Sequence, residues 1–103
     1  MSWALVQIAE GDEKRRNGIA AEIYPADLAR ADDGGAVTIP NVSVSPAGFV
    51  RQEAEGFVIE AEADGPLDGI EPGPYAFLKD VGRAVAEYMG EACHTVPPRT
   101  IPA

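Results

Sequence analysis

The chain has 103 residues, which is enough for one domain with a single modest core. Seventeen acidic residues against eight basic ones give a net charge of −9, which argues against a surface built to bind the phosphates of a nucleic acid. The single cysteine excludes an internal disulfide, and a hydrophobic fraction of 46% is ordinary for a globular protein.

Two strands are predicted near the N-terminus. Residues 3–8 are apolar and rich in β-prone side chains, and residues 19–24 alternate in the manner of a strand with one buried face. The polar segment 11–18 between them ends in Asn17 and Gly18, a strong turn signal because both residues tolerate positive φ. We therefore expect these strands to be joined by a polar hairpin loop.

The segment after residue 24 has two interpretations. Residues 25–32 begin with a proline that suits the first turn of a short helix, and Gly34 and Gly35 would stop it, but an irregular loop fits equally well. In residues 37–44 the apolar positions change phase across Pro40. This change predicts a bulge or bend in an edge strand, because a regular strand would turn its buried face outward there.

The clearest alternation lies in the middle of the chain. Residues 49–54 and 57–63 are predicted to form two strands joined by a tight hairpin at Glu55 and Gly56. Residues 64–73, with three glycines and two prolines, are predicted to form a loop.

A C-terminal helix is predicted over residues 74–89, with Pro74 in its first turn and Gly90 as its stop. Its apolar stripe at the 3.6-residue period consists of Phe77, Leu78, Val81, Val85, Tyr88 and Met89. Residues 1–90 are thus expected to form one compact α+β domain, an antiparallel sheet of about four or five strands with one amphipathic helix packed on a face. Residues 91–103, with three prolines, are expected to form an extended tail.

Neither of two candidate pairs of catalytic residues has all the groups that its chemistry needs. Cys93 and His94 are the residue types of a thiolate–imidazole pair, but neighbours in an extended segment point to opposite sides. Glu60 and Glu62 share a strand face about 6.5–7 Å apart, as glycosidase carboxylates do, yet few aromatic residues remain for a sugar platform. We therefore expect no enzymatic activity and no catalytic residue.

Metal and cofactor sites are also not expected. One cysteine and one histidine cannot form a zinc site within the chain, and no glycine-rich phosphate loop precedes the helix. Four acidic residues in loop 62–71 could surround a hard cation, although their spacing differs from that of an EF-hand. The alternative is that this loop is simply a solvated acidic surface.

The charges are unevenly distributed. Residues 53–71 contain seven acids and no base, which would attract cationic partners. This predicted acidic surface consists of Glu53, Glu55, Glu60, Glu62, Asp64, Asp68 and Glu71. The basic cluster of residues 14–16 is either a small anion or partner contact or part of a polar hairpin loop.

The tail and the one tryptophan are the candidate docking elements. An extended apolar and proline-rich arm can lie in a neighbour's groove or extend a neighbour's sheet, but it can also fray or fold back on its own domain. Trp3 either seals an edge of the core or anchors an interface. The predicted partner-binding residues are Trp3, Val96, Pro97, Pro98, Arg99 and Ile101.

These observations predict a non-enzymatic assembly or interaction protein that docks through its C-terminal arm and a sheet edge in a multi-subunit particle, for example as a small virion structural or decoration component. The alternatives are an acidic regulator or inhibitor that mimics nucleic-acid charge and a small accessory subunit of a larger enzyme. We expect protein partners in a homo- or hetero-oligomer, with no direct contact to nucleic acid or membrane. Because the N-terminus lacks a secretory pattern, we expect the cytoplasm or a particle assembled there.

Overall fold

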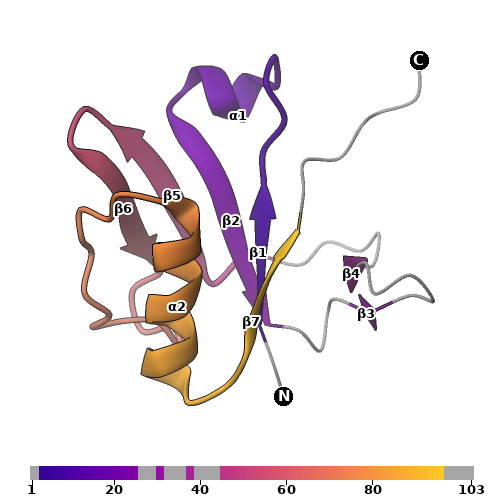
Figure 1. Ribbon diagram of the computed structural model, residues 1–103, viewed down its shortest axis with the longest axis vertical. Coiled ribbons are helices and arrows are strands. Elements are labelled where there is room, and N and C mark those ends of the chain that lie inside the picture. Colours follow the sequence, from indigo (N-terminus) through magenta and orange to yellow (C-terminus); the bar gives the residue numbers. More distant parts are fainter. Residues whose placement is uncertain (1–2, 26–29, 32–36, 39–44, 97–103) are drawn as a thin grey trace.

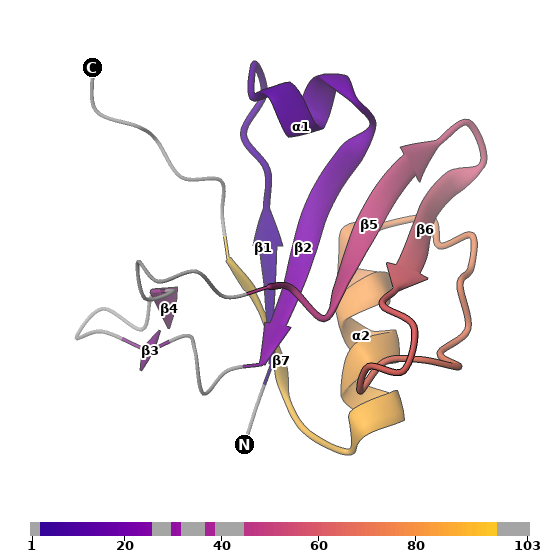
Figure 2. The same ribbon diagram turned by 180° about the vertical axis from the view of Figure 1, so that it is seen from behind.

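The computed structural model describes residues 3–25, 30–31, 37–38 and 45–96 (Figure 1). Five strands form one sheet in the order β6-β5-β2-β1-β7. Helix α2 (Leu78–Met89) lies on one face of this sheet, as the front and back views show (Figures 1 and 2). The predicted α+β architecture, with one C-terminal helix packed on a sheet, is confirmed.

Strands β1 (Trp3–Gln7) and β2 (Ile19–Pro25) are antiparallel, with Leu5 opposite Ile23. Their connection contains a short helix, α1 (Glu13–Arg16), where the sequence indicated only a polar loop. Asp12 explains this turn of helix, because its carboxylate accepts a hydrogen bond from the Lys14 N–H at the N-cap position.

Strands β5 (Gly48–Glu53) and β6 (Gly56–Ala61) form the predicted hairpin, with Val50 opposite Ile59. Strand β5 also pairs antiparallel with β2, which joins the two hairpins into one sheet.

The sheet is mixed, so the prediction of a purely antiparallel sheet with a tail from residue 91 is wrong. Strand β7 (Cys93–Val96) lies parallel to β1, with Trp3 opposite Cys93 and Val6 opposite Val96. The prolines that disfavour pairing begin only at residue 97, so all four residues of β7 retain their N–H groups. The folded unit therefore extends at least to Val96 and does not end at residue 90.

Helix α2 begins at Leu78, four residues later than predicted. The backbone of Tyr75 is instead bridged to Phe57 of β6, each N–H donating to the other residue's carbonyl at 2.7–2.8 Å. Residues bonded in this extended way cannot also form the first turn of a helix. The predicted stop is confirmed, since Gly90 caps the helix in the left-handed conformation.

The main core lies between the sheet and α2. Its fully buried larger side chains are Leu5, Ile23, Leu67, Val50, Val81 and Val85. The ends of the predicted apolar stripe are not all buried, because Phe77 is 61% exposed and Tyr88 is 47% exposed. Phe77 precedes the helix as its N-cap residue, and Tyr88 lies in the last turn.

Segment 25–44 is described only in part. Pro25 ends β2, and β3 (Arg30–Ala31) pairs antiparallel with β4 (Val37–Thr38) in a separate two-stranded sheet. The predicted helix over 25–32 is therefore wrong at residues 25, 30 and 31, because these residues have extended backbones. The predicted bend at Pro40 and the stop at Gly34 and Gly35 lie outside the described residues.

Candidate functional site

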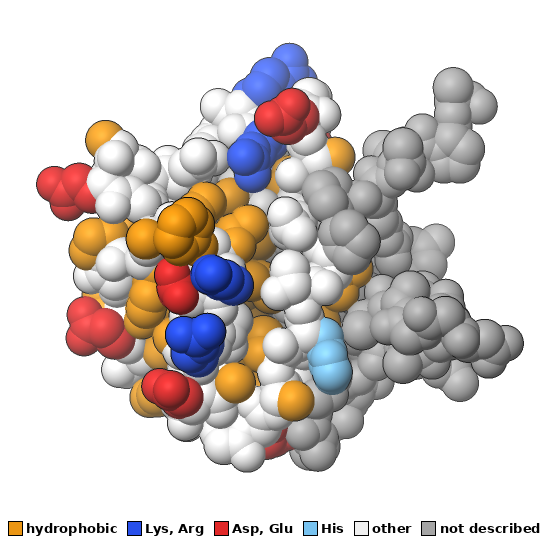
Figure 3. All heavy atoms as spheres, in the orientation of Figure 1, with side chains coloured by type: hydrophobic (Ala, Val, Ile, Leu, Met, Phe, Trp, Pro, Cys, Tyr) orange, Lys and Arg blue, Asp and Glu red, His pale blue; other side chains and the backbone are white. Residues whose placement is uncertain are grey.

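The seven residues of the acidic surface are all exposed. On the face that carries α2, most acidic side chains lie toward the side of the molecule where β6 is found, with hydrophobic side chains between them (Figure 3). The Glu60 carboxylate forms an ion pair with Arg51 at 2.5 Å, and Asp68 accepts a hydrogen bond from the Asp64 N–H. Arg51 is the one base that forms an ion pair with any of these seven carboxylates in the described part of the chain, so residues 53–71 carry a strong negative charge.

The predicted partner-binding residues do not lie together: two are buried in the domain, and the others follow it in the sequence. Trp3 is 4% exposed in the main core, and Val96 is 8% exposed in a small cluster with Ala4 and Val6 on the other face of the sheet. Pro97, Pro98, Arg99 and Ile101 lie outside the described residues. Both described members of the set are therefore packed inside the chain's own fold.

The basic cluster of residues 14–16 contributes to the fold through Lys14. Its ammonium lies 3.3 Å from both carboxylate oxygens of Glu22, a β2 residue that is only 7% exposed. A buried carboxylate requires such a partner, so the pair favours the structural interpretation of Lys14.

The two edges of the five-stranded sheet differ. Along β6, Phe57 exchanges two backbone hydrogen bonds with Tyr75, and the Ile59 N–H donates to the Pro72 carbonyl at 2.9 Å. Along β7, the inner edge pairs with β1, and within the described ranges no strand pairs with the outer edge. One edge is thus covered by the chain itself, whereas on the other edge no strand pairs with β7 among the residues that the structure describes.

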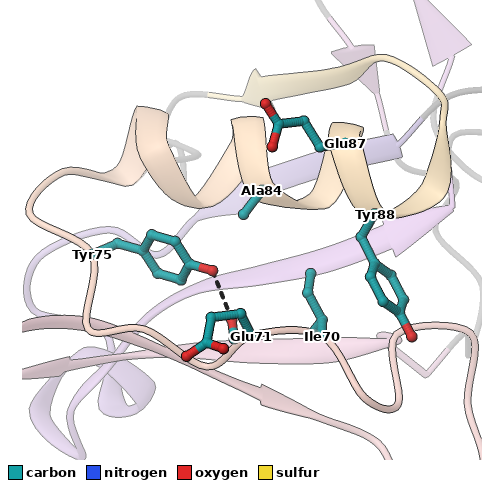
Figure 4. A pocket seen from close by; sticks show the side chains of 6 residues that line it. All are labelled: Ile70, Glu71, Tyr75, Ala84, Glu87 and Tyr88. Atoms are coloured by element: carbon teal, nitrogen blue, oxygen red, sulfur yellow. Dashed lines mark hydrogen bonds between the residues drawn. The ribbon is translucent and has the colours of Figure 1, made fainter.

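An open surface pocket of about 360 Å³ lies between α2 and the segment that precedes it. Its lining residues are Ile70, Glu71, Tyr75, Ala84, Glu87 and Tyr88. In Figure 4 the two tyrosine rings lie at opposite ends, with Ile70 and Ala84 between them and the two glutamates on opposite rims. The lining therefore combines an aromatic and aliphatic interior with two carboxylates.

Both tyrosines are held by their hydroxyl groups. The Tyr75 hydroxyl donates to the Glu71 carbonyl, drawn in Figure 4, and the Tyr88 hydroxyl donates to the Asp68 carbonyl, each at 2.7 Å. A buried or half-buried tyrosine that satisfies its hydroxyl in this way has a defined ring orientation. The pocket is therefore built on fixed rings.

Two glycines allow Tyr75 to lie where it does. Gly56 has φ +135°, and a Cβ there would lie 2.4 Å from the Tyr75 carbonyl oxygen. Gly73 has φ +105°, and a Cβ there would lie 2.7 Å from the Tyr75 ring. Other residues would meet both an unfavourable backbone conformation and a steric clash at these positions.

The carboxylates affect the nearby phenol. Burial and then the negative charges of Glu71 and Glu87 raise the pKa of Tyr75 above its ordinary value. Tyr75 therefore remains a neutral hydrogen-bond donor over the physiological pH range, and the pocket has negative charge only on its rims.

Sequence reasoning missed this pocket. It assigned Tyr88 to the core stripe of the helix and gave Tyr75 no role, while Glu71 was included only in the acidic surface. The tyrosine was the available signal, as the one stripe residue with a hydroxyl group, because that hydroxyl needs a partner and therefore favours the margin of a core. The pocket itself depends on a contact between α2 and residues 70–75, which no local pattern reveals.

Cys93 lacks the lowered pKa that an activated thiol nucleophile needs. Burial raises the pKa of the Cys93 thiol to about 11, so the thiol is protonated near neutral pH. His94 is exposed on β7. Within the described residues no three histidine, cysteine or acidic side chains are grouped in a way that could hold a metal ion, and loop 62–71 belongs to that range.

Comparison with known proteins found no matching family model, no similar curated protein and no similar solved structure. In the described part of the chain, no helix is long and apolar enough to cross a membrane.

Proposed function

We propose that the chain is a non-enzymatic interaction protein that joins a larger assembly by pairing the outer edge of β7 with an extended strand of another subunit. The observation that carries this proposal is the difference between the two sheet edges. The chain covers the β6 edge with its own segment 72–75, while the described residues contain no strand on the outer edge of β7.

The register indicates which groups a partner strand would meet. The Trp3 N–H donates to the Ala92 carbonyl at 2.7 Å, and parallel pairing alternates from that point. The N–H groups of His94 and Val96 are therefore directed toward β1, and those of Cys93 and Thr95 toward the outside. Outward N–H groups with which no described strand pairs are a template for β-strand addition.

The arm predicted from the sequence fits this mode of docking. Pro97, Pro98, Arg99 and Ile101 follow β7 directly, so a partner bound at the β7 edge would be within their reach. In this proposal the backbone of β7 provides affinity, and the arm extends the contact along the same partner. The buried side chains of Trp3 and Val96 support β7 from within the domain and do not touch the partner.

The proposal is tested with Thr95→Pro, which removes an outward N–H, and with Thr95→Val as the matched control, which keeps it. Association is measured by light scattering for self-association, and by affinity for any protein that co-purifies from the native source. We expect Thr95→Pro to weaken association at least tenfold and Thr95→Val to leave it nearly unchanged.

Amide exchange in the unmodified chain provides a second measurement that does not depend on the folding of a variant. The Thr95 N–H should exchange rapidly in the free chain and slowly in the complex, whereas the Val96 N–H should be protected in both. The proposal is overturned if the chain neither self-associates nor retains a partner, or if the Thr95 amide is unaffected by association.

A further inference from the structure

We propose that the pocket between α2 and residues 70–75 is a receptor for an arginine side chain of a protein partner. This inference rests on the proposed function only in that the partner is a protein. It concerns a different surface, since none of the residues that line the pocket belongs to β7.

The shape and lining of the pocket suit a long side chain with an apolar stem and a planar cationic head. Ile70 and Ala84 provide aliphatic contact for the stem, and the rings of Tyr75 and Tyr88 stand at the two ends (Figure 4). A guanidinium stacks on tyrosine rings through cation–π attraction, and it is less strongly hydrated than an ammonium. These properties favour arginine over lysine.

Charge identifies the ligand as a cation. The exposed carboxylates of Glu71 and Glu87 lie on opposite rims, and no lysine or arginine lines the pocket. The two bases of α2 have other neighbours, because Lys79 lies 5.3 Å from the Phe77 ring centre and Arg83 faces Asp80 at 4.0 Å. A guanidinium in the pocket can therefore meet a carboxylate with two parallel hydrogen bonds.

The negative potential extends beyond the pocket. Asp68 and Asp64 continue from Glu71 along the loop, and the remaining acids of the surface lie on the β5–β6 hairpin and at its end. A basic segment whose arginine occupies the pocket would thus also be attracted by the carboxylates of the neighbouring loop, of which Asp68 is bonded through its carbonyl to Tyr88. This negative field increases the rate at which the partner meets the chain, while the pocket determines which side chain is bound.

The pocket is also organised before binding. The hydroxyl groups of Tyr75 and Tyr88 are bonded to backbone carbonyls, so the rings need not be ordered by the ligand. Preorganised groups reduce the entropic cost of binding. By contrast, a solvated acidic loop alone would have no such fixed rings.

The test uses three soluble peptides of equal length in which glycine and serine separate either arginine, lysine or citrulline residues. Nuclear magnetic resonance titration follows the amides of Ile70, Glu71, Ala84 and Tyr88. We expect the arginine peptide to bind most tightly, the lysine peptide more weakly and the neutral citrulline peptide not measurably. Tyr88→Ala should weaken binding of the arginine peptide by roughly three- to tenfold, the range expected for an exposed cation–π contact and its packing.

A pair of charge-matched variants separates the pocket from general attraction. Glu71→Gln with Glu87→Gln should weaken binding by at least fivefold, whereas Glu10→Gln with Glu13→Gln, which removes the same charge from the β1–β2 connection, should have little effect. Equal losses for the two pairs, or equal affinity for the arginine and lysine peptides, would overturn the proposal. Because the peptides carry no strand for β7, their binding should be the same in Thr95→Pro, so either proposal can fail without the other.

Discussion

Tyr88 has two roles, as part of the apolar stripe of α2 and as part of the pocket lining, and its position in the sequence indicates only the first. It follows Val81 and Val85 at helical spacing, yet it is 47% exposed and its hydroxyl donates to the Asp68 carbonyl in the loop beside the helix. The periodicity correctly placed the buried valines, because both lie in the middle of the face that meets the sheet. At the margin of that face, the need to satisfy the hydroxyl determines the position of the tyrosine.

Lys14 shows the same dependence on a distant partner. The sequence presents it as one of three adjacent bases, but its ammonium is 3.3 Å from the carboxylate of Glu22, eight residues later. The side chain of Glu22 points to the opposite face of β2 from those of Ala21 and Ile23. Only the turn of helix α1 brings the Lys14 ammonium close to it. A local charge pattern could not distinguish this ion pair from an anion contact.

At the residue scale, the Cys93 thiol should react slowly near neutral pH. Its pKa of about 11 lowers the thiolate fraction at mildly alkaline pH by on the order of a hundredfold relative to an ordinary thiol of pKa about 8.5. The rate of alkylation by iodoacetamide should therefore increase only as the pH approaches 11 in the folded chain. In urea, where the chain is unfolded, the same increase should occur at a lower pH. The single cysteine accounts for all of the signal.

The raised pKa of Cys93 also makes the stability of the fold depend on pH. The folded chain holds this proton more tightly than the unfolded chain, so the contribution of Cys93 is complete below the unfolded pKa and declines as the pH rises toward about 11. Alkylation of the folded chain at neutral pH as rapid as in urea would contradict both statements.

At the scale of elements, α2 and β7 were predicted with unequal success. The helix has a strong signal at the 3.6-residue period, although its first four predicted residues are not helical because Tyr75 bonds to Phe57. Strand β7 has only four residues, next to prolines, and it pairs with the first strand of the chain. Parallel pairing between the two ends of a chain leaves no short-range pattern to read.

Replacement of Gly82 by alanine should stabilise the protein. Gly82 lies buried within α2, where a Cβ would lie 3.8 Å from Leu5 Cδ2 and from Thr95 Oγ1, which is ordinary contact distance. Alanine is favoured over glycine inside a helix, so the free energy of unfolding should rise by about 0.5–1 kcal/mol. Urea denaturation measures this change.

Gly48→Ala is the matched control for that prediction. A Cβ at Gly48 would lie 3.1 Å from the Glu60 carbonyl oxygen and 3.4 Å from Ala61 Cα, so the same substitution should destabilise β5 against β6. If Gly82→Ala lowered the free energy of unfolding, the packing described between α2, β1 and β7 would be incorrect.

At the scale of the whole molecule, the net charge of −9 should oppose folding at low ionic strength. Among the described residues, the ion pairs at 3.3 Å or less are Lys14–Glu22, in which the carboxylate is buried, and the exposed pair Arg51–Glu60, which contributes about 0–1 kcal/mol. Self-repulsion therefore outweighs attraction, so added sodium chloride should raise the melting temperature by a few degrees through screening. A melting temperature that falls with salt would show that the attractive pairs dominate.

Features with local signals can be read from the amino-acid sequence: the β1–β2 and β5–β6 pairs, the loop after β6, the body of α2 and the concentration of acids on residues 53–71. Hydrophobic periodicity and turn residues encode these features within a few positions of the chain. Three other features arise only from contacts in the folded chain: the parallel pairing of β7 with β1, the closure of the β6 edge by residues 72–75 and the pocket between α2 and residues 70–75. Each of these joins segments through backbone hydrogen bonds or packing across the fold, and such contacts leave no periodic trace in either segment.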